Sequence, residues 1–343
     1  MDTYSFRESP LRVYGAPLFY ETGSLHRLPR ELAQKMHSSV ISWKLDVRCP
    51  GARVAFKTDA EEFEVRVELE PLRFDPGMAL WAAQSSCVFT GRGESMRYAG
   101  LAVPPEGYKQ PCAVGKFRKS SALEDVLIYL PRNEEVKEVY VSVPDGARVE
   151  APTPYRYETP VVFYGSSITE GGCASKVSNA YNALMCRRLD CDFINLGFSG
   201  CALGELCVAD YINSLDKSVF VLDYDHNAPT PEHLERTHEP FFLRVREHSP
   251  DLPIIIVGGP YLYLEDENVK KRREILRRTY ENALARGDKH VWYIDSAELL
   301  GSEDREACTA DCVHPNDLGM YRMSERIQPV LEEALKDFEA LRG

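Results

Sequence analysis

The second half of the chain alternates short apolar runs with longer helical patterns, and no other feature restricts the fold as strongly. Helical spacing occupies residues 179–189, 233–247 and 268–285, and a last helix is expected from about Asn316. The apolar runs between them are residues 161–164, 193–196, 219–222, 254–257 and 291–294. Such runs indicate strands buried on both faces. Strands that alternate with helices predict a parallel sheet of about five strands covered by helices.

The first half has the period of strands instead. In residues 63–69 an apolar residue occupies every second position. Similar runs occur at residues 39–47, 52–57, 126–130 and 138–143. Clusters of Pro, Gly and Asp separate the runs, and short strands at this spacing predict a jelly-roll-like β-sandwich.

A proline-rich segment joins the two patterns. Residues 144–160 contain four prolines, and 343 residues are more than one hydrophobic core usually supports. We therefore expect an all-β domain at residues 1–155 and an α/β domain at residues 156–343.

Charge and hydropathy exclude several classes of protein. A net charge of −12 disfavours general binding to nucleic acid or to anionic membranes. No apolar run approaches the roughly 20 residues of a membrane helix, and the N-terminus lacks the apolar core of a signal peptide. The sequence as given thus indicates a cytoplasmic protein, whereas a trimmed signal peptide would mean a periplasmic or secreted one. The ten cysteines form no Cys-x-x-Cys unit, so we expect buried free thiols.

Polar residues follow the predicted strands, where an open parallel sheet binds its ligands. Ser167 follows the first strand, directly after a glycine and a serine. The second strand leads into a glycine-rich loop with Gly200, and glycines let a backbone N–H approach a ligand closely. Asn227 follows the third strand and offers an uncharged hydrogen-bond donor. Near the C-terminus, Asp311 and His314 are three residues apart, so one turn can deliver both a carboxylate and an imidazole.

These loops resemble the blocks of the SGNH hydrolases, also called GDSL esterases and lipases. Residues 165–169 (GSSIT) resemble the family's Gly-Asp-Ser-Ile-Thr block, residues 195–200 its glycine block, and residues 311–316 its Asp-x-x-His-Pro block. The sequence departs from the family at Ser166, where Asp is typical, and around Asn227, which lies in His-Asn-Ala-Pro rather than Gly-x-Asn-Asp. The resemblance implies a flavodoxin-like parallel sheet for this domain.

The same resemblance implies a serine-hydrolase mechanism. Ser167 would be the nucleophile, His314 its base, and Asp311 the carboxylate that orients the histidine. The N–H groups of Ser167 and Gly200 and the amide of Asn227 would form an oxyanion hole. Neither a metal nor a cofactor takes part in such a mechanism.

The pairing of this domain with a β-sandwich resembles a two-domain branch of the family, typified by bacterial acetylhydrolases of carbohydrates. That branch has a Gly-x-Asp-Leu-Tyr signature, for which residues 85–89 (SSCVF) stand at a plausible place. The resemblance implies a carboxylic ester hydrolase that removes short acyl groups, acetyl foremost, from a small molecule or a carbohydrate. It does not specify the oligomeric state.

Two other kinds of enzyme remain alternatives. The same acyl-serine can be passed to an alcohol, which would make the protein an acyltransferase. A metal hydrolase would use the polar residues near the third strand, namely Asp223, Asp225, His226, His233 and His238. The five-residue spacing of the last two histidines does not place both on one helix face, which favours solvated polar residues instead.

Two binding functions are further alternatives to an enzyme. A non-catalytic carbohydrate-binding protein would use aromatic side chains such as Trp43, Trp81 and Tyr98, although core packing explains them more simply. The basic residues 270–273 lie in a helical pattern with Glu267 and Glu274 on either side, which indicates a solvated face rather than a nucleic-acid site.

Overall fold

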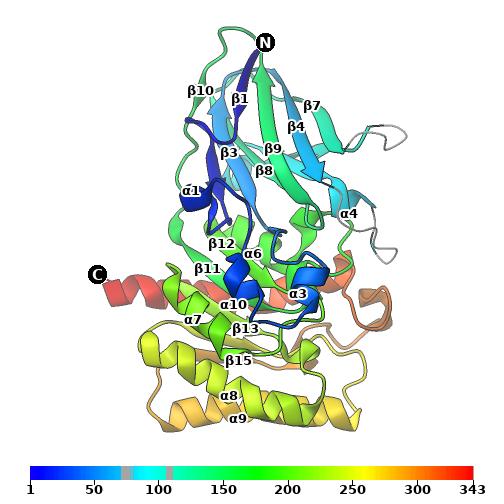
Figure 1. Ribbon diagram of the computed structural model, residues 1–343, viewed down its shortest axis with the longest axis vertical. Helices are drawn as coiled ribbons and strands as arrows, with labels where there is room; N and C mark the ends of the chain where they lie inside the picture. The colour runs from blue at the N-terminus through cyan, green and yellow to red at the C-terminus, as the bar shows by residue number, and fades with distance from the viewer. Residues whose placement is uncertain (71–77, 79, 106–110, 343) are drawn as a thin grey trace.

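The apolar runs of the second half pair as parallel strands in the computed structural model, which describes residues 1–70, 78, 80–105 and 111–342 (Figure 1). The strands are β11 (Tyr157–Gly165), β12 (Cys191–Gly197), β13 (Val219–Asp223), β14 (Ile254–Val257) and β15 (Val291–Ile294). Their order across the sheet is β12-β11-β13-β14-β15, with the first strand between the second and the third. This is the order of flavodoxin-like sheets, which confirms the predicted fold class.

Each face of the parallel sheet has its own helices. The helices are α6 (Tyr181–Leu189), α7 (Leu206–Ser214), α8 (Pro231–His248), α9 (Glu267–Ala285) and α10 (Asp317–Arg342). Val161 and Phe163 of β11 pack with residues of α6 and α10 on one face. Val162 and Tyr164 point to the other face, where they pack with residues of α7, α8 and α9. Burial on both faces explains why these strands are apolar along their length.

The first half forms two antiparallel sheets. One sheet has the order β1 (Asp2–Ser5), β9 (Glu135–Val143), β4 (Glu62–Glu70) and β7 (Cys112–Arg118). The other has the order β10 (Val149–Glu150), β3 (Arg53–Thr58), β8 (Glu124–Tyr129), β5 (Ser86–Thr90) and β6 (Arg97–Ala102), and β2 (Arg12–Tyr14) pairs with β3. Phe63, Val65 and Val67 of β4 share a core with Val54 and Phe56 of β3. The predicted sandwich-like domain is confirmed.

Residues 39–47 are not the strand that their alternation predicts. The segment begins as α3 (Ser39–Ser42), and Lys44 has a φ of 53°, which lies outside the β region. Val40 and Leu45 are buried in the core of the α/β half instead. Alternation indicates only that some side chains are buried, and here the α/β half covers them rather than a paired strand.

The first half of the chain contains three further short helices, and a short connection joins the two halves. The helices are α1 (Phe19–Thr22), α2 (Arg30–Ala33) and α4 (Leu80–Gln84). The connection runs from Glu150, where β10 ends, to Tyr157, where β11 begins. Figure 1 shows the halves stacked along the long axis, with α8 and α9 farthest from the N-terminus.

Two sequence expectations concern the chain as a whole. All ten cysteines lie in the described ranges; none of them forms a disulfide, and seven are buried. No helix in the described part of the chain combines the length and the apolar composition that crossing a membrane requires.

Candidate active site

A tight turn at the carboxyl end of β11 presents Ser167. Gly165 ends the strand, and a β-carbon there would overlap neighbouring side-chain and backbone atoms. Ser166 then caps the short helix α5 (Ser167–Glu170), because its Oγ accepts a hydrogen bond from the Ile168 N–H at 3.1 Å. Ser167 is the first residue of α5, and its side chain lines a cavity of about 470 Å³.

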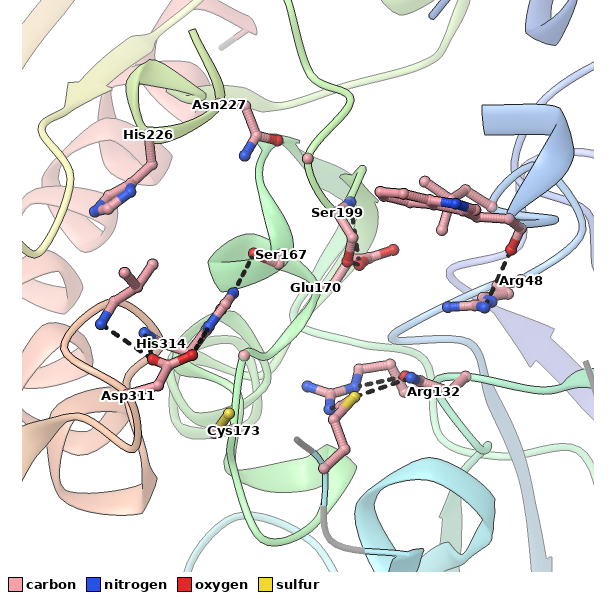
Figure 2. Close-up of a pocket in the computed structure, with 17 residues that line it drawn as sticks. Arg48, Arg132, Ser167, Glu170, Cys173, Ser199, His226, Asn227, Asp311 and His314 are labelled. Carbon is pink, nitrogen blue, oxygen red and sulfur yellow. Dashed lines mark hydrogen bonds and ion pairs between the residues drawn. The ribbon is translucent and has the colours of Figure 1, made fainter. Parts of the chain in front are cut away.

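The imidazole of His314 joins Ser167 to Asp311. Ser167 Oγ lies 2.8 Å from His314 Nε2, and His314 Nδ1 lies 2.7 Å from Asp311 Oδ2. Figure 2 shows the three side chains linked in this order beside the cavity. The residues predicted as nucleophile and as orienting carboxylate therefore each lie within hydrogen-bond distance of the predicted base, His314.

The loop before α10 holds the Asp311 carboxylate. Its Oδ1 accepts hydrogen bonds from the backbone N–H of Val313 at 3.0 Å and of His314 at 2.7 Å. Partial burial by itself would raise the pKa of Asp311, but these bonds and the His314 side chain lower it below its usual value. An ionised Asp311 favours a proton on His314 Nδ1, which leaves Nε2 as an acceptor facing Ser167.

Gly200 and Asn227 line the same cavity from two other loops. Gly200 follows β12 with a φ of 66°, in the left-handed region that glycine adopts without strain. Asn227 follows β13, and its Oδ1 accepts a hydrogen bond from the Ala202 N–H at 3.2 Å. That contact leaves the amide NH₂ to face the cavity, and Figure 2 shows its nitrogen directed towards Ser167.

The first half of the chain supplies one wall of this cavity. The residues of this wall are Trp43, Leu45, Arg48, Met78, Arg132 and Asn133. In Figure 2, Arg48 and Arg132 lie on the opposite side of Ser167 from Asp311. Sequence reasoning assigned none of these residues to the active site, because only the docking of the two halves brings them there.

The aromatic residues considered for sugar binding are not core residues. Trp43, Trp81 and Tyr98 are 38%, 57% and 45% exposed, so the interpretation as core packing was wrong. Trp43 lies beside the cavity, where a β-carbon on Gly200 would be 3.5 Å from its ring. Its exposure follows from the position of residues 39–47 at the edge of the α/β half rather than inside the sandwich.

The acidic residues and histidines around β13 do not meet at one point. Asp223 is buried and accepts a hydrogen bond from the Tyr181 hydroxyl at 2.7 Å, and burial raises its pKa to about 8. His233 Nε2 lies 2.9 Å from a backbone carbonyl, whereas His238 Nδ1 lies 2.8 Å from Thr279 Oγ1. Within the described ranges, no three His, Cys, Asp or Glu side chains form a group that could hold a metal ion.

His226 lines the cavity beside Asn227 without adding charge at neutral pH. Its ring stacks on Tyr261 with the ring centroids 4.4 Å apart. Burial, with the nearby Arg272 charge, lowers the pKa of His226 to about 4. The neighbouring Asp225 accepts hydrogen bonds from the Gly259 N–H and the Tyr261 hydroxyl, each at 3.1 Å.

Comparison with known proteins identifies the family. Residues 158–332 match the GDSL-like lipase/acylhydrolase family, and residues 2–149 match the N-terminal GxDLY domain of SGNH-hydrolase-type esterases. The chain belongs to the GDSL-like lipase/acylhydrolase family. No protein of curated function matches the sequence.

Solved structures of similar architecture include enzymes of several specificities. A protein from Bacteroides ovatus described as a GDSL-like lipase is 26% identical, with 98% of each chain covered and a TM-score of 0.85. The salicylyl-acyltransferase SsfX3 from a tetracycline biosynthetic pathway is 21% identical, with 97% of each chain covered and a TM-score of 0.75. A family two carbohydrate esterase from Clostridium thermocellum is 15% identical over 84% of this chain and 95% of that one, with a TM-score of 0.60.

In this GDSL-like hydrolase, the segment considered for the Gly-x-Asp-Leu-Tyr signature lies away from the cavity. Residues 86–89 belong to β5, and none of residues 85–89 lines the cavity. Cys87 and Phe89 pack instead against the core of the α/β half, together with Phe193 of β12. The segment therefore contributes to the contact between the two halves.

Proposed function

We propose that this GDSL-like hydrolase cleaves short acyl esters, acetyl esters foremost, through an acyl-serine intermediate. The observation that carries the proposal is the hydrogen-bond chain from Asp311 through His314 to Ser167, which ends at the cavity. A serine hydroxyl is a weak nucleophile by itself, and a neutral imidazole at 2.8 Å is the base that activates it.

In the first step, Ser167 Oγ forms a bond to the carbonyl carbon of the ester while its proton moves to His314 Nε2. The carbonyl π electrons move to oxygen, and Asp311 stabilises the imidazolium. The N–H groups of Ser167 and Gly200 and the Asn227 amide are the proposed donors to this oxyanion. Each preorganised donor is worth on the order of 3 kcal/mol.

Collapse of the tetrahedral intermediate breaks the bond to the alcohol, which leaves with the proton from His314. Water then attacks the acyl-serine, and His314 takes a proton from the water. A second tetrahedral intermediate releases the carboxylic acid and returns the proton to Ser167 Oγ.

The lining of the cavity supports a short acyl group and a polar alcohol. Polar and charged side chains predominate, among them Arg48, Arg132 and Glu170. A long acyl chain gains about 0.8 kcal/mol for each CH₂ buried against apolar side chains. Only five of the seventeen lining residues have such side chains, namely Trp43, Leu45, Met78, Cys173 and Val313. A sugar hydroxyl suits the same surface, and the fold that this chain shares with carbohydrate esterases agrees with that class of alcohol.

A chain-length series tests the proposed acyl group. We expect p-nitrophenyl acetate to be hydrolysed faster than the butyrate, with the octanoate a poor substrate. Faster turnover of octanoate than of acetate would contradict the proposal. A panel of acetylated mono- and oligosaccharides then tests the alcohol, with release of acetate as the measurement.

Acyl transfer is the second candidate, because the architecture is shared with a salicylyl-acyltransferase and an acyl-serine can react with an alcohol as well as with water. The ratio of transferred to hydrolysed product, measured at increasing concentrations of an added alcohol, separates the two activities. Covalent labelling of Ser167 by a fluorophosphonate separates both from a protein that only binds carbohydrate.

A further inference from the structure

Two buried arginines of the first half contact the two ends of β12. Arg53 forms an ion pair with Asp192 near the start of the strand, donates to the Phe193 carbonyl at 3.2 Å, and stacks on the Phe193 ring at 4.0 Å. Arg27 contacts the opposite end, beyond which the glycine-rich loop begins. Neither side chain is exposed to solvent.

Arg27 joins three separate segments through its guanidinium group. Its Nη2 lies 2.6 Å from Glu170 Oε1, and its Nη1 donates to the Gly197 carbonyl. Its Nε donates to the Leu45 carbonyl at 2.6 Å, and its charge lies 4.4 Å from the centre of the Phe198 ring. All three nitrogens thus have defined partners.

Glu170 connects Arg27 to the residues of the active site. It is the last residue of α5, the helix that begins with Ser167. Its second oxygen, Oε2, accepts hydrogen bonds from the hydroxyl and from the N–H of Ser199. Ser199 directly precedes Gly200, and Figure 2 shows Glu170 and Ser199 linked beside Ser167.

These contacts place the nucleophile and the glycine-rich loop in one rigid arrangement. Oxyanion stabilisation requires donors that are oriented before the reaction, and a shift of about 1 Å can cost two orders of magnitude in rate. Glu170 is buried, and a buried carboxylate without its cation is strongly destabilised. Loss of the Arg27 guanidinium would therefore release both the carboxylate and the loop that it holds.

We propose that Arg27 is a positioning residue of the active site: through Glu170 and Ser199 it fixes residues 198–200 relative to Ser167, which makes the first half of the chain part of the catalytic apparatus. This inference rests on the proposed function, because it assigns the glycine-rich loop to the oxyanion hole. An ordinary structural ion pair between the halves is the competing interpretation.

Arg53 provides a matched control for that interpretation. Like Arg27, it comes from the first half, is fully buried and pairs with a carboxylate of the second half. Each arginine also stacks on a phenylalanine: Arg53 on Phe193 within β12, and Arg27 on Phe198 directly after it. It differs in its place, since Asp192 lies at the amino end of β12 and the cavity at the carboxyl end. A purely structural role would give both arginines the same effect.

The experiment compares Arg27→Met, Arg27→Lys and Arg53→Met in the full chain. For each variant, kcat and KM with p-nitrophenyl acetate and the second-order rate of fluorophosphonate labelling are measured below the onset of thermal unfolding.

We expect Arg27→Met to lower kcat and the labelling rate about 30-fold or more, with KM changed less than about threefold. Arg27→Lys keeps the charge but not the fork of donors, so it should be intermediate. Arg53→Met should lower Tm while both rates stay within about threefold of the wild type.

Equal rate losses in Arg27→Met and Arg53→Met, or wild-type rates in Arg27→Met, would overturn the inference. Should neither Arg27 variant fold, Ser199→Ala decides: it keeps the ion pair and removes one hydrogen bond to Glu170. We expect it to lower the labelling rate about fivefold to tenfold, and an unchanged rate would reject the positioning role. A wild-type protein without labelling at Ser167 would reject the proposed function and this inference together, whereas normal labelling of Arg27→Met would reject the inference alone.

Discussion

Ser167 and His314 stand 147 positions apart in the sequence, yet the Oγ of one lies 2.8 Å from the Nε2 of the other. Ser167 follows β11, which lies between two neighbours within the sheet, and His314 precedes α10. Residues of β11 and α10, such as Phe163 and Met320, share one hydrophobic core. Two elements that share this core, β11 and α10, therefore hold the two residues in contact. The contact also distinguishes Ser167 from its neighbour Ser166.

Replacement of Ser167 by alanine should affect activity, whereas replacement of Ser166 should affect stability. Ser167→Ala removes the proposed nucleophile and should abolish hydrolysis of p-nitrophenyl acetate. Ser166→Ala should keep most of the activity but lose about 1 kcal/mol of stability, because the Ser166 Oγ caps α5 through the Ile168 N–H. Activity assays and urea unfolding measure the two effects separately.

Ser166→Asp is the control for the cap, since a carboxylate accepts the same hydrogen bond. Its stability should return close to that of the wild type. An active Ser167→Ala protein beside an inactive Ser166→Ala protein would show that the nucleophile is misassigned.

The Asp311 and His314 side chains should contribute as one unit. His314→Ala should cost nearly as much activity as Ser167→Ala, whereas Asp311→Asn should leave a measurable remainder. The double variant should be no worse than His314→Ala alone, because Asp311 acts through the imidazole. Losses that multiply in the double variant would mean that the two residues act independently.

The pH profile gives a second test of this pair. The pKa of Asp311 is held below its usual value, so the carboxylate stays charged in mildly acidic solution. The decline of kcat/KM towards acid pH should therefore report protonation of His314, the base that must be neutral to accept the serine proton. A wild-type kcat/KM that does not decline towards acid pH would contradict this assignment.

The Asn227 amide should affect the rate more than substrate binding. Asn227→Ala should lower kcat about a hundredfold or more if the amide donates to the oxyanion. Asn227→Asp keeps an acceptor for the Ala202 N–H but loses the donor, so it should lose at least as much. A change confined to KM in both variants would make Asn227 a binding residue instead.

His238 should make the stability of the protein depend on pH. It is buried beside Thr279, and burial lowers its pKa from 6.5 to about 3. Between these values the unfolded chain binds a proton that the folded chain excludes, so stability falls as the pH drops. Between pH 7 and pH 5 the wild type should lose about 2 kcal/mol more than His238→Asn in urea unfolding.

His248→Asn is the matched control, because this histidine is exposed at the end of the same helix. Its pH dependence should follow that of the wild type. Equal pH dependence in the wild type and in His238→Asn would show that the buried ring takes up its proton without unfolding.

The local sequence pattern was sufficient to predict the parallel sheet and the order of the motifs along the chain. Strands buried on both faces must be apolar along their length, so the runs beginning at Val161 and Ile254 can be predicted as strands without knowledge of the strands with which they pair. The carboxyl ends of parallel strands meet at one edge, so residues after different strands could be assigned to one site before their contacts were known. Ser167 and Asn227 were assigned in this way, whereas Asp311 and His314 were singled out by their three-residue spacing ahead of the last helix.

Only the tertiary structure decided which residues of the first half belong to that site. Residues 39–47 alternate like a strand, yet Val40 and Leu45 are buried against the α/β half, and Trp43 is left at the cavity. Arg27 carries no local signal at all, because its partner Glu170 lies 143 positions away. A sequence period records that one face of a segment is buried, but not which surface covers it. That choice depends on the docking of the two halves, which creates contacts between residues far apart in the chain.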